Sequence, residues 1–345
     1  MTRSPLLPNR SLPDFFVCDV LNVSPKSDIA GLEHPLFSLS TKADKRIRRY
    51  EAPNSKEFIE ITPSVKGLAT VHDRDILIFC ISQCIAALNE KKEISKTLRF
   101  KAYDLLVSTN RPTGGESYLR LREALDRLIG TRITTNIATG NQEVTKGFGL
   151  IESYEIIRET SKGRMQDIEI TVADWVFNAI EAKEVLTLNR NYFRLRKSLE
   201  RRLYEIARKH CGRQTSWKIS LELLKSKTGS SSTTKEFRRL ISKIVKEDND
   251  YNHMPDYSVS LLDNDLVEFR SRNSIPPSKD KIKSDFVDSI SLKADTYHKA
   301  RLVAPGWDVY VLEDEWRDWM TEPPRDPDAA FIGFCRKVLA KRGTA

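Results

Sequence analysis

The feature that most constrains the fold of this chain is an order of segments that occurs twice. Each occurrence has three segments with apolar residues at helical spacing, followed by two segments rich in β-branched residues around a turn. The first comprises residues 73–89, 100–108 and 116–129 as helices and 132–137 and 149–158 as strands. The second comprises residues 191–210, 220–227 and 233–246 as helices and 257–262 and 266–270 as strands. Three helices followed by a β-hairpin is the order of a winged helix, so the sequence predicts two winged helices in tandem.

The whole chain is expected to be a helix-rich α+β protein. At 345 residues it is longer than one hydrophobic core ordinarily serves. We place the first winged helix at residues 67–160 and the second at residues 161–272. Residues 1–66, with several Pro and Ser and short strand-like runs, are expected to form an extended arm or a small sheet. Residues 273–345 are expected to form a polar linker and a small helical C-terminal region.

The positive charge of the chain is concentrated in one stretch. Residues 190–246 hold seventeen Lys and Arg against four Asp and Glu, a local charge of +13, whereas the whole chain carries only +9. Such a basic face is the electrostatic footprint of a surface for phosphate backbones. Residues 308–328 hold eight acids against two Arg, so that face of the C-terminal region would repel DNA. The charge pattern therefore indicates double-stranded DNA as the partner of the second winged helix.

The third helix of each module has the character of a recognition helix, with apolar residues inward and polar residues outward. In the second module, Thr233 and Glu236 have the spacing of a capping box that begins this helix. A single basic amphipathic helix is more often an ordinary solvated helix. Two of them, each followed by a hairpin, favour DNA binding.

The predicted DNA-binding residues follow from these helices and from the hairpin of the first module. In the first module they are Ser117, Arg120, Arg122 and Arg127, with Lys146 at the hairpin tip. In the first helix of the second module they are Arg194, Arg196, Lys197, Arg201 and Arg202, as anchors for phosphates. In its third helix they are Thr234, Lys235, Arg238, Arg239, Ser242, Lys243 and Lys246. Some cations of the first helix are expected to pair instead with Glu200 and Glu205 at helical spacing.

Enzyme classes find little support in the sequence. It has no G-x-x-x-x-G-K-[ST] loop, and its five histidines are far apart, unlike the metal-binding pair expected of a nicking initiator. Asp263 and Asp265 lie where a hairpin must turn. Cys80 and Cys84 share a helix face without zinc-type partners, and the five cysteines are read as reduced thiols. We therefore expect no catalytic residue, cofactor or metal.

The expected location is the cytoplasm. No apolar run approaches the ~18 to 20 residues that a membrane span requires, and the first ten residues do not resemble a signal peptide.

Several long stretches resemble the plasmid replication initiator protein A family. The longest is VLTLNRNYFRLRKSLERRLYEIARKHCG at residues 185–212. The others are residues 62–70, 103–106 with 110–115, and 147–151, and the resemblance covers about residues 12–272. It implies a bacterial plasmid initiator that binds repeated sites at an origin, helps to open the duplex and recruits host initiator and helicase-loading proteins.

The same resemblance implies a dimer, which in such proteins often represses the initiator's own promoter. Two alternatives remain open on the sequence. A transcriptional repressor would use the same DNA-binding parts, and a catalytic replication protein such as a primase or nickase would need chemistry that the motifs do not show.

Overall fold

The computed structural model forms two units, residues Met1–Ser274 and Ile275–Ala345. It describes residues 4–10, 18–19, 35–51, 58–139, 142–158, 165–182, 185–212, 214–272, 290, 292–305, 307, 309–320 and 324–342. The expected linker at residues 273–285 lies outside the described residues, as do residues 11–17 and 20–34 of the expected N-terminal arm.

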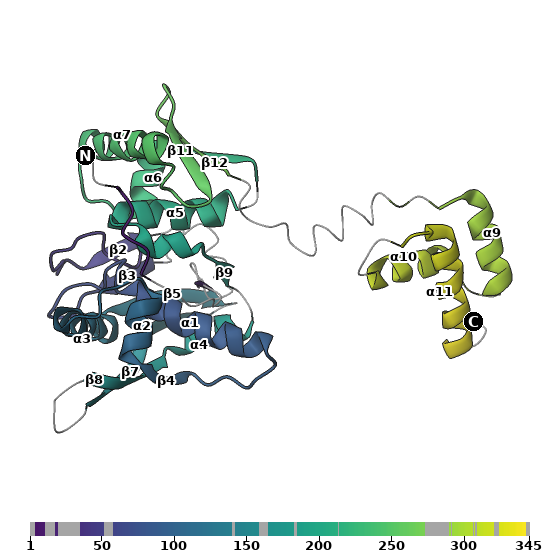
Figure 1. Ribbon diagram of the computed structural model, residues 1–345, viewed down its shortest axis with the longest axis horizontal. Helices are drawn as coiled ribbons and strands as arrows, with labels where there is room; N and C mark the ends of the chain where they lie inside the picture. Colours follow the sequence, from purple (N-terminus) through teal and green to yellow (C-terminus); the bar gives the residue numbers. More distant parts are fainter. Residues whose placement is uncertain are drawn as a thin grey trace. The chain divides into compact units, whose positions relative to one another are not determined.

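The second winged helix is built from three helices and three strands (Figure 1). They are α5 (Ser198–His210), β10 (Ser216–Ser220), α6 (Leu221–Thr228), α7 (Thr234–Tyr251), β11 (Tyr257–Leu261) and β12 (Leu266–Ser271). Strand β12 lies between β10 and β11 and pairs antiparallel with both. At the start of α6 the Ser220 hydroxyl accepts a hydrogen bond from the Leu223 amide, and Gly229 ends the helix with a φ of 71°. Because few side chains tolerate that φ, glycine suits the turn toward α7.

The first module repeats this topology. Its elements are α1 (Arg74–Asn89), β4 (Thr97–Lys101), α2 (Ala102–Ser108), α3 (Gly115–Gly130), β7 (Ile151–Arg158) and β8 (Met165–Val172). Strand β8 lies between β4 and β7, as β12 lies between β10 and β11. In both modules, therefore, the strand after the first helix pairs with the last strand of the hairpin.

The hairpin predicted for the first module is wrong. Apart from Arg132, which pairs with Gly149, residues 132–137 do not pair with residues 149–158. Strand β5 (Arg132–Thr139) pairs with β6 (Gln142–Gly149), and β7 pairs with β8. The wing of this module thus continues to Val172, beyond the predicted boundary at residue 160. Apolar spacing identifies strands without specifying their partners, and here two hairpins follow one another along the chain.

The additional hairpin joins a sheet with the N-terminal segment. Its strand order is β2 (Arg48–Glu51), β3 (Phe58–Thr62), β5 and β6. The Thr135 hydroxyl donates to the Phe58 carbonyl at 2.8 Å, which adds a side-chain bond to the pairing of β3 with β5. Of the two forms expected for the N-terminal segment, a small sheet is present at these strands.

The long helix predicted from residue 191 is also wrong over its first seven residues, 191–197. Residues Arg190–Arg194 form a 3₁₀ helix, and α5 begins only at Ser198. Between them Leu195 and Lys197 are extended, with ψ of 123° and 133°. The Arg194 carbonyl accepts a hydrogen bond from the Leu7 amide at 2.8 Å, so the N-terminal residues hold the chain in this break.

Short elements connect the two modules. Helix α4 (Asp174–Glu181) follows β8, and β9 (Leu186–Thr187) pairs antiparallel with β1 (Cys18–Asp19).

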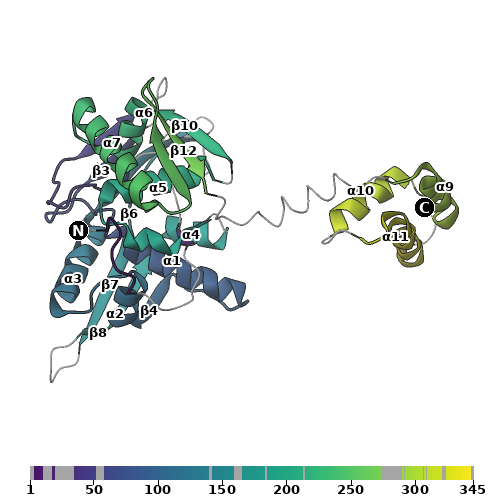
Figure 2. The ribbon, with the colours of Figure 1, turned by 45° about the horizontal axis from the view of Figure 1, so that its top comes forward.

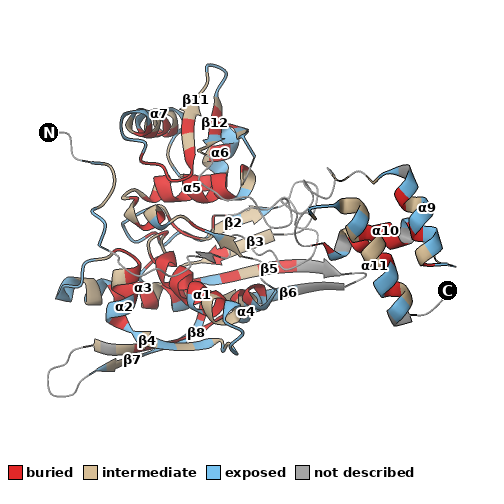
Figure 3. Ribbon diagram, turned by 45° about the vertical axis from the view of Figure 1, so that its right-hand side comes forward, coloured by how far each residue is buried: buried red, intermediate tan, exposed pale blue. Residues whose placement is uncertain are grey.

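Buried ion pairs join the first helices of the two modules, α1 and α5, which are buried along much of their length (Figure 3). The Arg74 guanidinium lies 2.6 Å from a Glu205 carboxylate oxygen. The Arg201 guanidinium lies 2.7 Å from Asp75. All four side chains are at most 5% exposed, so separating the modules would leave buried charges without partners. The two winged helices therefore belong to one compact unit, and these ion pairs oppose their separation.

The C-terminal unit has its own core. Helices α9 (Ala294–Val303), α10 (Val309–Trp319) and α11 (Pro327–Arg342) pack around Trp316 and Phe331, whose ring centroids are 5.3 Å apart. Within the part of the chain that the structure describes, no helix combines the length and the apolar character needed to cross a membrane.

Candidate nucleic-acid interface

Helix α7 presents a polar face above an apolar one. Phe237, Ile241 and Ile244 are buried beneath it. Its exposed outer side carries Thr234, Lys235, Arg239, Ser242, Lys243 and Lys246. Three of these cations, Lys235, Lys243 and Lys246, form no ion pair with any described residue. Their charge is therefore available to an external partner.

The beginning of α7 confirms half of the predicted capping box. The Thr233 hydroxyl accepts a hydrogen bond from the Glu236 amide at 3.2 Å. The Glu236 carboxylate pairs with Arg239 at 2.6 Å. This pair orients the Arg239 guanidinium along the exposed face of the helix.

Arg238 has a different role from its neighbour. Its guanidinium contacts Asp265 in the turn between β11 and β12. This ion pair links the third helix to the wing and neutralises an acidic group at the wing turn. Arg238 therefore belongs to the polar face of α7 and also holds the wing turn against that helix.

The corresponding face of α3 is less cationic. Arg122 is exposed, and Arg120 pairs with Glu116 one turn earlier at 2.6 Å. Ser117 is half-buried near the start of the helix. Arg127 forms two hydrogen bonds to Asp73, at 2.7 and 2.8 Å, and so fixes α3 against the start of α1. Of the four residues on α3 that are predicted to bind DNA, Arg127 is thus engaged in a contact that holds α3 to the start of α1.

The two third helices lie on the same side of the N-terminal unit. In Figures 1 and 2, α3 and α7 both lie on the left side of the view. A surface that includes both helices can contact one duplex at two places.

Two of the predicted phosphate anchors are in the interior, which corrects the prediction. Arg201 donates to Asp75 and to the Phe193 and Leu195 carbonyls. Arg202 donates to Glu205 and to the Lys227 carbonyl at the end of α6. Both side chains are at most 7% exposed, so neither reaches a phosphate at the surface in this structure.

The remaining anchors, Arg194, Arg196 and Lys197, lie between the last residue of the 3₁₀ helix and the start of α5. Arg194 donates to the Leu7 carbonyl at 2.9 Å, and Arg196 is half-buried without an ion pair to a described residue. The Lys197 ammonium contacts the Glu200 and Glu247 carboxylates. Lys146 is exposed on β6, in the additional hairpin instead of the wing.

Two clefts adjoin the third helices, and residues 38–44 take part in both. One, of about 610 Å³, is lined by α7, the start of α5, the Ser230–Ser232 loop and residues 38–48. The other, of about 630 Å³, is lined by α3, residues 109–112 and residues 41–43. Thr41 and His72 line both clefts.

The shared His72 stays neutral at physiological pH. Burial, together with the positive charge of Arg201, lowers the pKa of its imidazole to about 4. Nearby, the hydrogen bonds from Arg46 and Arg48 hold the pKa of the Asp44 carboxyl well below its usual range. The cleft beside α7 therefore contains both a neutral imidazole, His72, and an ionised carboxylate, Asp44, whereas His72 alone of the two also lines the cleft beside α3.

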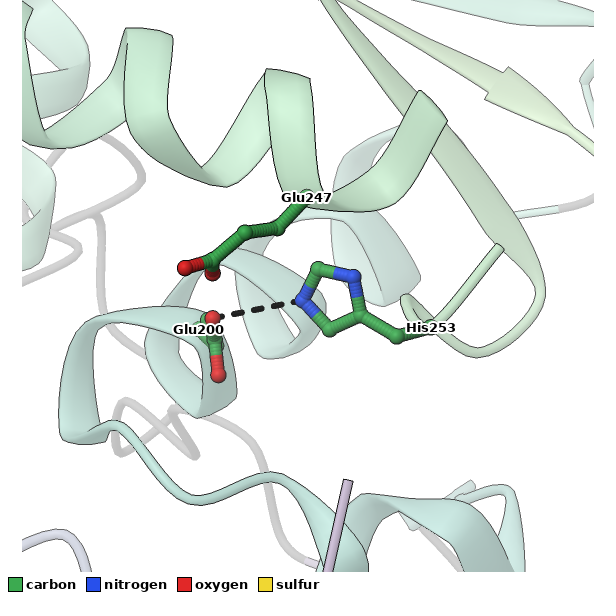
Figure 4. Close-up of side chains that lie close together, drawn as sticks. All are labelled: Glu200, Glu247 and His253. Atoms are coloured by element: carbon green, nitrogen blue, oxygen red, sulfur yellow. Dashed lines mark hydrogen bonds and ion pairs between the residues drawn. The ribbon is translucent and has the colours of Figure 1, made fainter. Parts of the chain in front are cut away.

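Glu200, Glu247 and His253 form a cluster with the ligand types of a metal site (Figure 4). Their ligand atoms lie within 4.8 Å of one another, and His253 Nε2 is 3.2 Å from Glu200. The Lys197 ammonium contacts both carboxylates and already supplies a positive charge. A divalent cation would have to displace it, so we interpret the cluster as an ion-pair network that fixes α5 to α7. Histidine spacing alone did not reveal this cluster.

Comparison with known proteins identifies the family. The model of the family described as Replication initiator protein A matches residues 26–259. A protein of Wigglesworthia glossinidia brevipalpis named "Putative replication protein" is 40% identical over 270 residues, which cover 76% of this chain and 95% of that protein. The chain belongs to the Replication initiator protein A family. The resemblance found in the sequence is confirmed.

Two solved structures share the fold of this family member. A selenomethionine crystal structure of domains 2 and 3 of RctB has a TM-score of 0.52 and 14% identity, covering 70% of this chain and 96% of that one. A second structure of the same domains has a TM-score of 0.50 and 15% identity, covering 69% and 95%. At such identity the likeness concerns the fold alone. Together with the repeated topology, it confirms an α+β fold with two tandem winged helices.

The sequence reasoning missed the part of the surface that precedes α1. Arg46 and Arg48 line the cleft beside α7, although the run around them predicts only a strand. Their basic character was visible in the sequence. Their proximity to α7 was not visible, because about 190 residues separate the two segments. Only the tertiary fold of this initiator-family chain brings them together.

Proposed function

We propose that this protein binds repeated duplex DNA sites at a replication origin through α3 and α7. Family membership supports a role in the initiation of replication. The observation that carries the DNA proposal is the outer face of α7, where exposed cations and hydroxyl groups lie above the buried Phe237, Ile241 and Ile244. Side chains of these types read base edges and contact phosphates in the major groove.

Opening of the origin and recruitment of host replication proteins belong to the same proposal. The sequence has no P-loop motif for ATP, so strand opening would depend on assembly of several bound copies and on host factors. Binding of this kind needs no covalent step, and the proposal assigns no catalytic residue or cofactor. The protein would act in the bacterial cytoplasm, with a dimer as the form that binds its own promoter.

The test combines footprinting with replication of a plasmid that carries the gene and its flanking DNA. The wild-type protein should protect repeated sequences and maintain the plasmid. The triple variant Lys235→Gln, Lys243→Gln and Lys246→Gln should lose both properties while it remains folded.

A matched control changes a cation away from α7. Lys92→Gln removes an exposed lysine that pairs with Glu90 after the end of α1, and it should behave as wild type. A triple variant that still protects the repeats and maintains the plasmid would contradict the assignment of α7. Protection of the gene's own promoter without plasmid replication would instead support a transcriptional repressor.

A further inference from the structure

The cleft between α7 and residues 38–48 is strongly cationic. Six basic side chains line it: Arg46, Arg48, Arg196, Lys197, Arg239 and Lys243. The lining contains one carboxylate, Asp44, and the other titratable group, His72, is neutral at pH 7 because its pKa is about 4. Concave walls of one charge sign concentrate the electrostatic field and attract ions of the opposite sign.

The cations of this cleft are only partly neutralised within the protein. Arg46 and Arg48 share Asp44, at 2.9 and 2.8 Å. Arg239 and Lys197 have their own carboxylate partners outside the lining. Arg196 and Lys243 have no ion pair with a described residue. The cleft therefore retains positive charge that an anion can balance.

Two guanidinium groups of the lining are also short of hydrogen-bond acceptors. Arg196 Nε and Arg48 Nη1 are buried and have no hydrogen-bond partner among the described residues. A buried donor without an acceptor is unfavourable. Because these two atoms are themselves inaccessible, an anion in the cleft would be bound by other nitrogens of the same groups.

The donor types and the size of the cleft select the class of anion. Guanidinium forks and hydroxyl groups suit the tetrahedral oxygens of phosphate, and the three consecutive residues Ser230–Ser232 place hydroxyl groups beside the cations. A volume of about 610 Å³ exceeds that of one phosphate and allows a larger molecule to carry it. Arg239 and Lys243 belong to α7, so the cleft opens beside the helix that we assign to DNA.

We propose that this cleft binds a phosphate group, and that residues 38–48 thereby form part of the ligand-binding surface. The inference deepens the proposed function and rests on it where the phosphate belongs to the duplex. The same chemistry would hold the phosphates of a free polyphosphate compound. The sequence predicts DNA contacts for Arg196, Lys197, Arg239 and Lys243, but it gives residues 38–48 no binding role.

The experiment uses the full-length variants Arg46→Gln and Arg196→Gln, which change cleft cations outside α7, with Lys92→Gln as the control. Duplex affinity is measured at several salt concentrations. If the phosphate belongs to DNA, each cleft variant should weaken all duplex sequences several-fold and reduce the slope of log affinity against log salt by about 0.9. Lys92→Gln should leave the slope unchanged.

A second arm tests free phosphate compounds. Inorganic pyrophosphate is titrated into the protein without DNA, and the melting temperature is followed. A saturable rise in wild type that is lost in Arg196→Gln would support the site with a free polyphosphate as its source. Arg196→Lys keeps the positive charge but lacks the paired donors of a guanidinium group. In whichever experiment supports the site, its salt slope or its rise in melting temperature should lie between those of wild type and Arg196→Gln.

The outcomes separate the two proposals. Unchanged salt slopes in both folded cleft variants, together with no saturable effect of pyrophosphate, would overturn the phosphate site while leaving DNA binding by α7 intact. A wild-type protein that binds no duplex would contradict the proposed function, and the pyrophosphate titration would still decide whether the cleft binds phosphate.

Discussion

Arg201 and Lys246 belong to the same +13 segment, yet they lie in opposite surroundings. Lys246 is exposed on α7, whereas Arg201 is buried against Asp75. We predict that Arg201→Met lowers the free energy of unfolding by about 3 kcal/mol or more, because Asp75 loses a buried partner. Urea denaturation measures this loss. The folded fraction should keep the wild-type dependence of DNA affinity on salt.

The control for this prediction is Arg122→Met, which removes an exposed arginine from α3. Its effect on the free energy of unfolding should stay within about 0.5 kcal/mol. If Arg201→Met were equally mild and instead reduced the salt slope, Arg201 would act as the phosphate anchor that its sequence position suggested.

His72 should make stability depend on pH. Its pKa is about 4 in the folded protein and 6.5 in the unfolded chain. As the pH falls from 6.5 toward 4, the unfolded chain binds a proton that the folded protein does not, so stability decreases. The full loss would be about 3 kcal/mol at most. The contribution is fully present above pH 6.5.

The measurement is the free energy of unfolding between pH 7 and 4.5, compared with His72→Gln. Carboxyl groups with lowered pKa values, such as Asp44 and Glu200, reduce the free energy of unfolding only as the pH falls below their ordinary pKa values of 3.8 and 4.5. The chosen pH interval therefore excludes most of their effect. The variant should show a flatter profile. Equal slopes in the two proteins would show that His72 does not titrate as its burial requires.

At the scale of single elements, the sequence predicted the helices far better than the strand partners. Helix α3 spans Gly115–Gly130 where 116–129 was expected, because apolar spacing within a helix is a local property. The partner of β7 is β8 instead of β5, since pairing depends on contacts distant in sequence. The break at Leu195 depends on the N-terminal residues 6 and 7, which also lie far away along the chain.

The candidate site was predictable to a similar degree. The outward residues of α7 followed from its periodicity, and the structure exposes most of them. The burial of Arg201 and Arg202 did not follow, because it depends on partners in α1 and α6. Charge counts locate a basic segment but do not separate surface cations from interior ones.

Helix α7 provides a prediction about how the protein recognises the base sequence of DNA. Ser242 is exposed on its outer face and makes no side-chain hydrogen bond to a described residue. We predict that Ser242→Ala reduces affinity by about 1 kcal/mol at one base position and leaves the salt slope unchanged, because a hydroxyl group contacts base edges without neutralising phosphate. Binding to a set of single-base variants of the repeat measures this. A uniform loss over all sequences would assign Ser242 to the backbone.

At the scale of the whole molecule, the junction between the modules determines how DNA can be bound. Ion pairs from Arg74 to Glu205 and from Asp75 to Arg201 are buried between α1 and α5. Residues 4–10 add a further link, since Leu7 bonds to Arg194 and the Pro8 carbonyl accepts from Asn110. We therefore expect α3 and α7 to keep a fixed separation, unlike two domains on a flexible tether.

A fixed separation makes the spacing within a DNA site critical. We predict that inserting about 5 base pairs between the halves contacted by α3 and α7 abolishes high-affinity binding, because it turns one half to the opposite face of the duplex. Inserting about 10 base pairs restores the face but moves the halves about 34 Å further apart, so a rigid protein should still fail to contact both. A protein with tethered modules would recover affinity with the longer insertion. Gel-shift titration of the two insertion sites against the native repeat distinguishes these cases, and recovery at 10 base pairs would show that the buried junction opens when DNA binds.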